Sequence, residues 1–163
     1  PDYIFPPGRP PSPPLSPLPP SPPPMSDQYQ FVFHAVRDAS EGNIQLGELQ
    51  LFGVSGEQLT IVSASNPRGA NPPAELPANV IDGLLHTKWL DSTIGSGKSS
   101  TLVLQLGAPK VVAQYELFTA DDVPSGKRDP VSWSFGILHD NYFEVLSAKS
   151  DVVAPYARMT SYG

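Results

Sequence analysis

The sequence predicts an all-β domain carried on a proline-rich arm, and three observations support this prediction. Residues 1–24 hold 13 of the 21 prolines in the chain of 163 residues. Several short segments after the arm alternate between apolar and polar side chains, as strands with one buried face do. No segment keeps a helical repeat of apolar residues for long. We therefore expect an arm at residues 1–26 and a single domain of ordinary size at residues 27–163.

The arm has the composition of an extended rod. Residues 6–24 read PPGRPPSPPLSPLPPSPPP. Proline fixes φ and offers no backbone N–H, so this run favours a polyproline II helix. At about 3.1 Å per residue such a helix would span roughly 60 Å. A plain linker and a ligand for proline-recognising domains are two interpretations of this composition.

A third interpretation of the arm follows from its Ser-Pro steps. The repeated units resemble the hydroxyproline-rich glycoproteins of plant and green-algal walls and flagellar surfaces, in which prolines are hydroxylated and glycosylated and serines can carry galactose. The resemblance implies an extracellular location, in a cell wall, on a flagellar surface or in a secreted fibril. It also implies modification at these positions: Ser12, Pro13, Pro14, Ser16, Pro17, Pro19, Pro20, Ser21, Pro22, Pro23 and Pro24.

The strands of the domain are expected one after another, separated by turns. They cover residues 29–36, 44–52, 59–62, 101–106, 111–118, 131–137 and 142–146. The clearest alternation, over 131–137, places Trp133 and Phe135 on the buried face. The alternation of the second segment slips at Gly47, which predicts a β-bulge. Residues 78–85 form the one stretch expected to make a helical turn or two.

The order of several motifs points to a family. The motif PANVIDG is followed by Thr87 and Trp89, then by the strand TLVLQLG, and later by RDPVSW at the start of another strand. Together these motifs resemble the galactose-binding-like superfamily, which includes discoidin domains, coagulation-factor C-type domains and family-32 carbohydrate-binding modules. The resemblance covers about residues 30–163. It implies a jelly-roll β-sandwich that takes its ligands at the loops of one end.

Two features depart from the family pattern. The family continues past a segment like Ser161–Gly163 into a last strand, whereas this sequence stops there. We therefore expect that strand to be missing or supplied by another chain, which leaves a free sheet edge. In addition, Phe143 stands near a position where the family has a tryptophan.

The resemblance also implies a structural Ca²⁺ ion. The side chains of Asp82 and Thr87 and the carbonyls of Asn79 and Leu84 would supply its ligands. Calcium takes about six to eight oxygen ligands, which such a loop can offer in part. The family's further carboxylate would lie beyond Gly163. The alternative is that Asp82 simply caps the turn.

Polar loop residues are the candidates for a sugar site. They come from three loops: Asn66, Arg68 and Asn71; Lys127, Arg128 and Asp129; His139 and Asn141. The alternative for each loop is a solvated turn. Trp89 and Trp133 could stack on a sugar, but both lie in alternating segments, which favours core packing.

Composition and motifs exclude several classes of protein. The net charge of −6, with scattered lysines and arginines, provides no basic surface for nucleic acid. No apolar run approaches the roughly 20 residues that span a bilayer. The absence of cysteine excludes disulfides and thiolate metal sites. Residues 95–99 resemble the end of a phosphate-binding loop, but Ser92 stands where its first glycine is needed. The histidines lack metal-ligand spacing and no nucleophile elbow occurs, so we do not expect an enzyme.

These observations predict an extracellular, non-catalytic module that binds glycans or adheres to neighbouring subunits. The alternative is a structural subunit of an extracellular glycoprotein fibril, of the flagellar-appendage or cell-wall type. Such a subunit would form a homopolymer through its arm and its free sheet edge. An intracellular discoidin-like adaptor is a third possibility.

Overall fold

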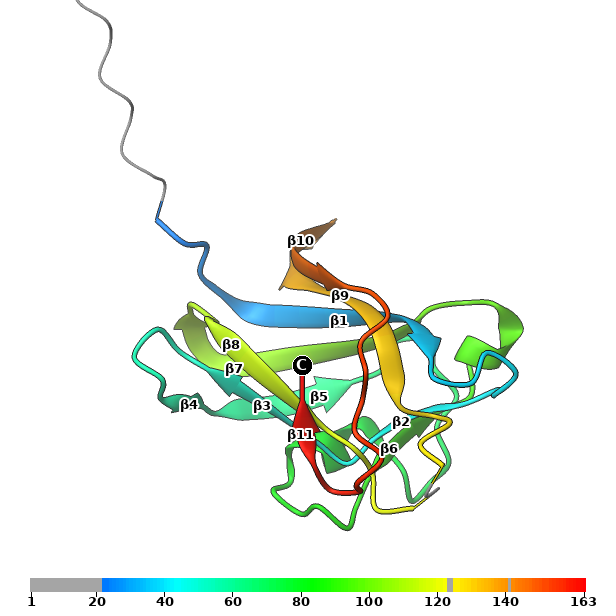
Figure 1. Ribbon diagram of the computed structural model, residues 1–163. Coiled ribbons are helices and arrows are strands. Elements are labelled where there is room, and N and C mark those ends of the chain that lie inside the picture. Colours follow the sequence, from blue (N-terminus) through cyan, green and yellow to red (C-terminus); the bar gives the residue numbers. More distant parts are fainter. Residues whose placement is uncertain (1–21, 123–124, 141) are drawn as a thin grey trace, which may run out of the picture.

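The computed structural model describes residues 22–122, 125–140 and 142–163, which form antiparallel β-sheets (Figure 1). The larger sheet has five strands in the order β10-β9-β1-β7-β5. Its strands are β1 (Ser26–Val36), β5 (Ile61–Ser65), β7 (Ser100–Lys110), β9 (Pro130–Leu138) and β10 (Phe143–Lys149). The predicted all-β class is confirmed.

A second sheet faces the first. Its four strands follow the order β11-β8-β3-β4. They are β3 (Glu48–Phe52), β4 (Gln58–Leu59), β8 (Gln114–Phe118) and β11 (Ser161–Tyr162). A separate pair joins β2 (Ile44–Leu46) to β6 (Trp89–Asp91). The helical turn expected at 78–85 is the short 3₁₀ helix η1 (Pro77–Ile81), and a second one, η2, spans Ile94–Ser96.

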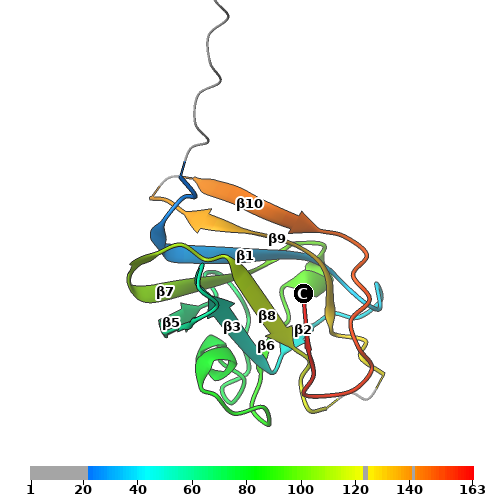
Figure 2. The ribbon, with the colours of Figure 1, turned by 60° about the vertical axis from the view of Figure 1, so that its left-hand side comes forward.

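One hydrophobic core fills the space between the two sheets. The rotated view in Figure 2 shows the backbone of the strands that surround it. Alternate residues of β1, among them Phe31 and Phe33, are fully buried. Trp89 and Trp133 are also fully buried, and both pack near Phe33, at ring-centroid distances of 5.9 and 6.5 Å. The indole N–H of Trp133 donates to the hydroxyl of Tyr115 over 2.9 Å. Core packing, as predicted, is therefore the role of both tryptophans.

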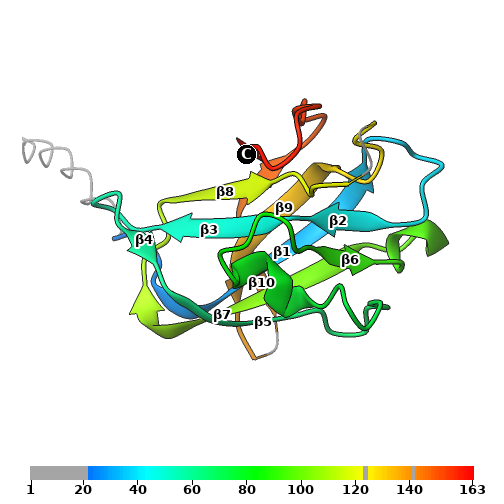
Figure 3. The same ribbon diagram turned by 90° about the horizontal axis from the view of Figure 1, so that it is seen from below.

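The strand expected over 44–52 is divided at Gly47. The part before Gly47 pairs with β6, whereas the part after it pairs with β8 (Figure 3). The Gly47 amide donates to the Phe118 carbonyl over 2.9 Å. A Cβ at this position would lie 3.0 Å from the Thr119 carbonyl oxygen, so only glycine fits easily. The β-bulge predicted at Gly47 is therefore wrong: the slip in alternation marks a break between β2 and β3, which pair with different strands.

The register of β1 defines two opposite ends of the domain. Its first residue, Ser26, pairs with Lys110, and the β9–β10 hairpin lies at this end. Its last residue, Val36, pairs with Pro130 at the other end, where the loops after β1, β5 and β6 gather (Figure 1). Pro22–Pro24 precede β1 and are exposed. The predicted modification sites Ser12 to Ser21 lie outside the described residues.

Within the described ranges, no helix is long and apolar enough to cross a membrane.

Candidate ligand-binding and calcium sites

A polar hollow of about 310 Å³ lies at the loop end of the domain, opposite the arm. One side is the turn at residues 66–69, which follows β5. The other side is formed by Asp91 at the end of β6 and by Lys98 and Ser99 before β7. The hollow therefore brings together two of the predicted ligand residues, Asn66 and Arg68, with residues that are distant in sequence.

The turn that carries Arg68 is strained. The Gly69 amide donates to the Asn66 carbonyl over 3.1 Å, Pro67 occupies the second position, and Arg68 at the third has a φ of 65°. This is the pattern of a type II turn, in which glycine or asparagine is usual at the third position. A bulky residue with such a φ costs about 1–2 kcal/mol. Strain of this kind is common at binding sites.

Asn66 contributes an unused hydrogen-bond donor. Its side-chain Nδ2 is buried and has no partner. A Cβ at Gly69 would lie only 1.8 Å from this nitrogen, so glycine at position 69 leaves room for the amide. Buried donors without partners are rare and favour a role in binding.

Two cations face the same hollow. Arg68 and Lys98 line it and are exposed, and neither forms an ion pair with a described carboxylate. Ser99 and Thr101 add hydroxyl groups. The hollow is consequently rich in donors.

Asp91 lines the hollow. It is fully buried and accepts hydrogen bonds from the amides of Ala70 and Thr93, each over 2.9 Å, and from the hydroxyls of Thr93 and Ser100. Burial raises the pKa of Asp91, but the hydrogen bonds from Ser100, Ala70 and Thr93 outweigh it and leave the pKa below its usual value. Asp91 thus ties the turn after β5 to the loop after β6.

Sequence reasoning did not select Asp91. Asp-Ser-Thr directly after a strand is typical of a side chain that caps its own turn, and this local signal could have found the residue.

Two residues of the second predicted loop form ion pairs, an exposed one at Lys127 and a partly buried one at Arg128. Lys127 lies 3.6 Å from Asp38, and Arg128 lies 3.4 Å from Glu41. Both pairs join this loop to the loop after β1. Asn71 is also used within the fold, because its side-chain amide donates to the Leu90 carbonyl over 2.6 Å.

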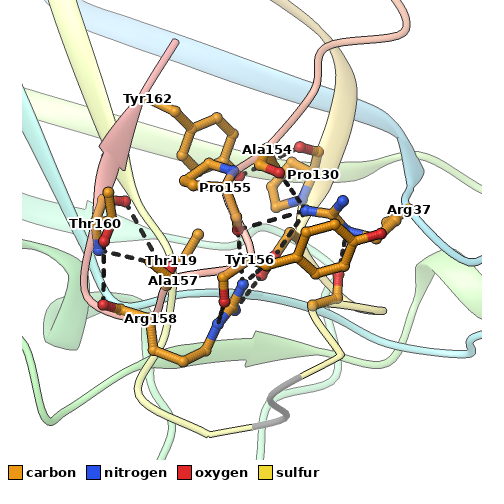
Figure 4. Close-up of polar contacts among 12 residues, drawn as sticks. Arg37, Thr119, Pro130, Ala154, Pro155, Tyr156, Ala157, Arg158, Thr160 and Tyr162 are labelled. Carbon is orange, nitrogen blue, oxygen red and sulfur yellow. Dashed lines mark hydrogen bonds and ion pairs between the residues drawn. The ribbon is translucent and has the colours of Figure 1, made fainter.

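Asp129, predicted as a ligand residue, lies in a buried ion-pair network. Its two carboxylate oxygens accept hydrogen bonds from Arg158 over 2.8 and 2.7 Å, and Arg37 lies 3.5 Å away. Figure 4 shows the Arg37 guanidinium over the ring of Tyr156, 4.2 Å from the ring centre. The hydrogen bonds that Arg158 donates to Asp129 raise the pKa of Arg158. This network fixes residues 154–158, and it leaves Asp129 inaccessible to a ligand.

His139 lies at the arm end of the domain, away from the hollow. Its ring stacks on Tyr142 at 4.2 Å, and its Nε2 lies 3.0 Å from Glu144. Asn141 is outside the described residues. Of the three predicted loops, only the first therefore contributes residues to the hollow, and the three loops do not form one site.

The four predicted calcium ligands converge on one point. The hydroxyl oxygen of Thr87 lies 3.0 and 2.9 Å from the Asp82 carboxylate oxygens, 2.8 Å from the Leu84 carbonyl and 3.5 Å from the Asn79 carbonyl. A hydroxyl has one proton, so it can satisfy one of these oxygens at a time. Such a concentration of oxygens fits Ca²⁺. The Leu84 amide also donates to Asp82 over 2.8 Å, so Asp82 caps the turn as well.

A second carboxylate reaches the same loop from β3. Glu48 is only 4 % exposed, and its Oε2 accepts a hydrogen bond from the Gly83 amide over 3.0 Å. Burial raises the pKa of Glu48 to about 7, with a further contribution from the charge of Asp82. In β3, Glu48 alternates in phase with the polar residue Gln50. The sequence pattern therefore does not predict that Glu48 is buried and reaches the loop at Gly83. In the described part of the chain, no three His, Asp or Glu side chains gather to hold a metal.

The described fold belongs to the all-β class with antiparallel sheets. Comparisons with protein-family models, with curated proteins and with solved structures found no match to this chain. The resemblance to the galactose-binding-like superfamily therefore rests on the motifs of the sequence.

Proposed function

We propose that this chain is an extracellular, non-catalytic glycan-binding module with the jelly-roll fold of the galactose-binding-like superfamily. The observation that carries the proposal is the hollow at the loop end. It combines the unpartnered amide of Asn66 with the cations Arg68 and Lys98 and with nearby hydroxyls. These groups are hydrogen-bond donors, and sugar hydroxyls and acidic sugar groups accept such bonds.

The exposed charges in the hollow favour an acidic glycan, because Arg68 and Lys98 are exposed whereas the Asp91 carboxylate is buried and held by hydrogen bonds. Arg68 and Lys98 lack carboxylate partners among the described residues, although the chain as a whole carries a net charge of −6. A guanidinium binds a carboxylate or sulfate through two parallel hydrogen bonds. The volume of about 310 Å³ is near the lower end of the usual range of roughly 300–1,000 Å³ for ligand sites. A short segment of a glycan with uronic acid or sulfate groups suits this size and charge.

The proposal includes one structural Ca²⁺ ion at the loop after η1. The Asp82 carboxylate, the Thr87 hydroxyl and the carbonyls of Asn79 and Leu84 would hold it. The ion would neutralise the crowded oxygens and fix the loop.

The extracellular location is supported by the arm. Its Ser-Pro units resemble those of hydroxyproline-rich glycoproteins, which are secreted. A non-catalytic role is supported by the carboxylate that lines the hollow, because Asp91 is saturated by structural hydrogen bonds.

Calorimetric titration with oligogalacturonate tests the glycan site. We expect Arg68→Ala to weaken binding about tenfold or more, since a charged hydrogen bond contributes roughly 1.5–3 kcal/mol. Lys127→Ala is the matched control, because it removes a cation from a neighbouring loop outside the hollow, and it should leave the affinity unchanged. Equal affinities for the wild type and Arg68→Ala would contradict the proposal, as would the absence of binding to acidic and neutral glycans alike.

A further inference from the structure

The larger sheet has an outer face, which is turned away from the core. Directly opposite residues of neighbouring strands point to the same side of a sheet. Gln30 of β1 pairs with Val103 of β7 on one side and with Gly136 of β9 on the other. The row continues to Ser65 of β5 and Val145 of β10, which are the two outer strands. The residues that alternate with this row in β1, β7 and β9 belong to the core, so the row itself faces outward.

Three such rows form a surface without charge, which we call the neutral face. The second row runs from Thr101 to Ala148 and the third from Ser63 to Phe143. The neutral face consists of these residues: Gln28, Gln30, Val32, Ser63, Ser65, Thr101, Val103, Gln105, Ser134, Gly136, Leu138, Phe143, Val145 and Ala148. None of them is charged, although the chain has 10 lysines and arginines and 16 aspartates and glutamates. Depletion of charged residues is typical of the centre of a protein interface.

Phe143 gives the neutral face an aromatic ring. A Cβ at Gly136 would lie 3.0 Å from Cε2 of Phe143, so the ring lies against the Gly136 backbone on the outer side. Glycine leaves the space that the ring occupies. Val145, which pairs with Gly136, is 53 % exposed. Aromatic residues are enriched in interfaces, so this part of the face suits contact with another protein.

The side chain of Gln30 lies in the middle of the central row and has no hydrogen-bond partner. Gln30 is only 9 % exposed, and its amide forms no hydrogen bond with another residue in the described ranges. A carboxamide can both donate and accept hydrogen bonds. Two glutamine side chains that face each other across a two-fold axis can each donate to the other. A second copy of the chain would therefore satisfy both amides.

The neutral face is large enough for a small dimer interface. Strands lie about 4.8 Å apart and alternate residues of a strand about 6.8 Å apart, so the three rows cover roughly 500 Å². Stable interfaces begin at about 600 Å² per partner, which the face reaches when a rim one residue wide is included.

The charge of the chain favours a second copy at this surface. Each copy has a net charge of −6, so two copies repel each other wherever their charged surfaces meet. The neutral face leaves no charge buried and unpaired when it meets its own copy. A two-fold contact uses the same surface on both copies and is the commonest symmetry of oligomers.

We propose that two copies form a two-fold dimer in which their neutral faces pack against each other, with Gln30 of each copy at the axis. The two sheets then lie about 10 Å apart, as stacked sheets do. The dimer does not depend on the proposed glycan site, because Arg68 and Lys98 lie in loops outside the sheet.

Sedimentation velocity of the full chain over a range of concentrations tests the dimer. We expect the wild type to reach twice the monomer mass of 17.5 kDa. Val145→Glu should raise the dissociation constant about tenfold or more, because it buries an unpaired charge in the interface. Val54→Glu is the matched control: Val54 is 70 % exposed in the turn between β3 and β4 of the other sheet, so the dissociation constant should not change. A wild type that stays monomeric at every soluble concentration overturns the proposal, as does a Val145→Glu variant that associates like the wild type.

A charge swap at Gln30 tests the two-fold arrangement. Gln30→Glu and Gln30→Lys should each be monomeric alone, because like charges then meet at the axis. Their equimolar mixture should associate again, because opposite charges then face each other. Circular dichroism of each variant checks that the fold is kept. Two folded variants whose mixture stays monomeric would overturn the arrangement.

Discussion

Arg68 is the residue at which stability and the proposed function conflict. Its φ of 65° suits glycine, yet its guanidinium is the strongest anion-binding group in the hollow. We predict that Arg68→Gly raises the free energy of unfolding by about 1 kcal/mol, because it releases backbone strain. The same variant should lose glycan binding. Urea denaturation measures the first effect and calorimetric titration the second.

Arg68→Lys is the control for this prediction. Lysine keeps both the charge and the strained backbone, so its unfolding free energy should equal that of the wild type. A destabilised Arg68→Gly variant would show that the arginine is retained for stability.

Glu48 should make the free energy of unfolding fall as pH rises, which is the opposite of what a carboxylate with a lowered pKa does. Its pKa is raised to about 7 in the folded chain, while the unfolded value is about 4.5. Between these values the folded state holds the additional proton, so this group's contribution to stability falls as pH rises from 4.5 to 7. In chelator, Glu48→Gln should therefore gain stability over the wild type by roughly 3 kcal/mol across this window. Urea denaturation at a series of pH values measures the difference, and a constant difference would contradict the prediction.

The position of residues 154–158, which precede β11, depends on the buried carboxylate of Asp129. Asp129 is fully buried and pairs with Arg158 and Arg37, which hold the carbonyls of residues 154 and 155 (Figure 4). We predict that Asp129→Ala lowers the free energy of unfolding by about 3–5 kcal/mol, because it leaves the arginines without a counter-charge. Lys127→Ala breaks an exposed ion pair and should change the free energy of unfolding by less than about 1 kcal/mol. Similar losses in both variants, measured by urea denaturation, would show that the buried carboxylate has no special role.

The loop after η1 is the element expected to respond to calcium. We predict that Ca²⁺ raises the melting temperature of the wild type, because an ion bound only to the folded state stabilises it by mass action. Asp82→Asn should abolish this rise, while Asp140→Asn, at the opposite end of the domain, should retain it. Differential scanning calorimetry with calcium and with chelator makes the measurement. An equal response in the wild type and Asp82→Asn would exclude the site.

At the scale of the whole molecule, the sequence predicted the features that depend on residues close together in the chain. Alternation located the main strands and the two buried tryptophans, and the slip at Gly47 marked a real change of pairing. The cluster of Asn79, Asp82, Leu84 and Thr87 could be assigned because its members lie close together in the chain.

What the sequence missed depends on contacts between distant residues. Lys98 joins Arg68 at the hollow from a different loop, and Glu48 reaches Gly83 from another strand. Asp129 was assigned to a ligand site because nothing in its neighbourhood reveals Arg158, 29 residues later. His139 was grouped with the other loops because alternation does not tell at which end of a sandwich a loop lies.

The most direct test of the central claim, glycan binding at the loop end, is a titration of the ¹⁵N-labelled chain with oligogalacturonate, followed by amide chemical shifts. We predict saturable shifts at residues 66–70 and 93–101, with none in the hairpin around His139. Shifts confined to that hairpin, or no shifts at all with acidic and neutral glycans, would contradict the claim.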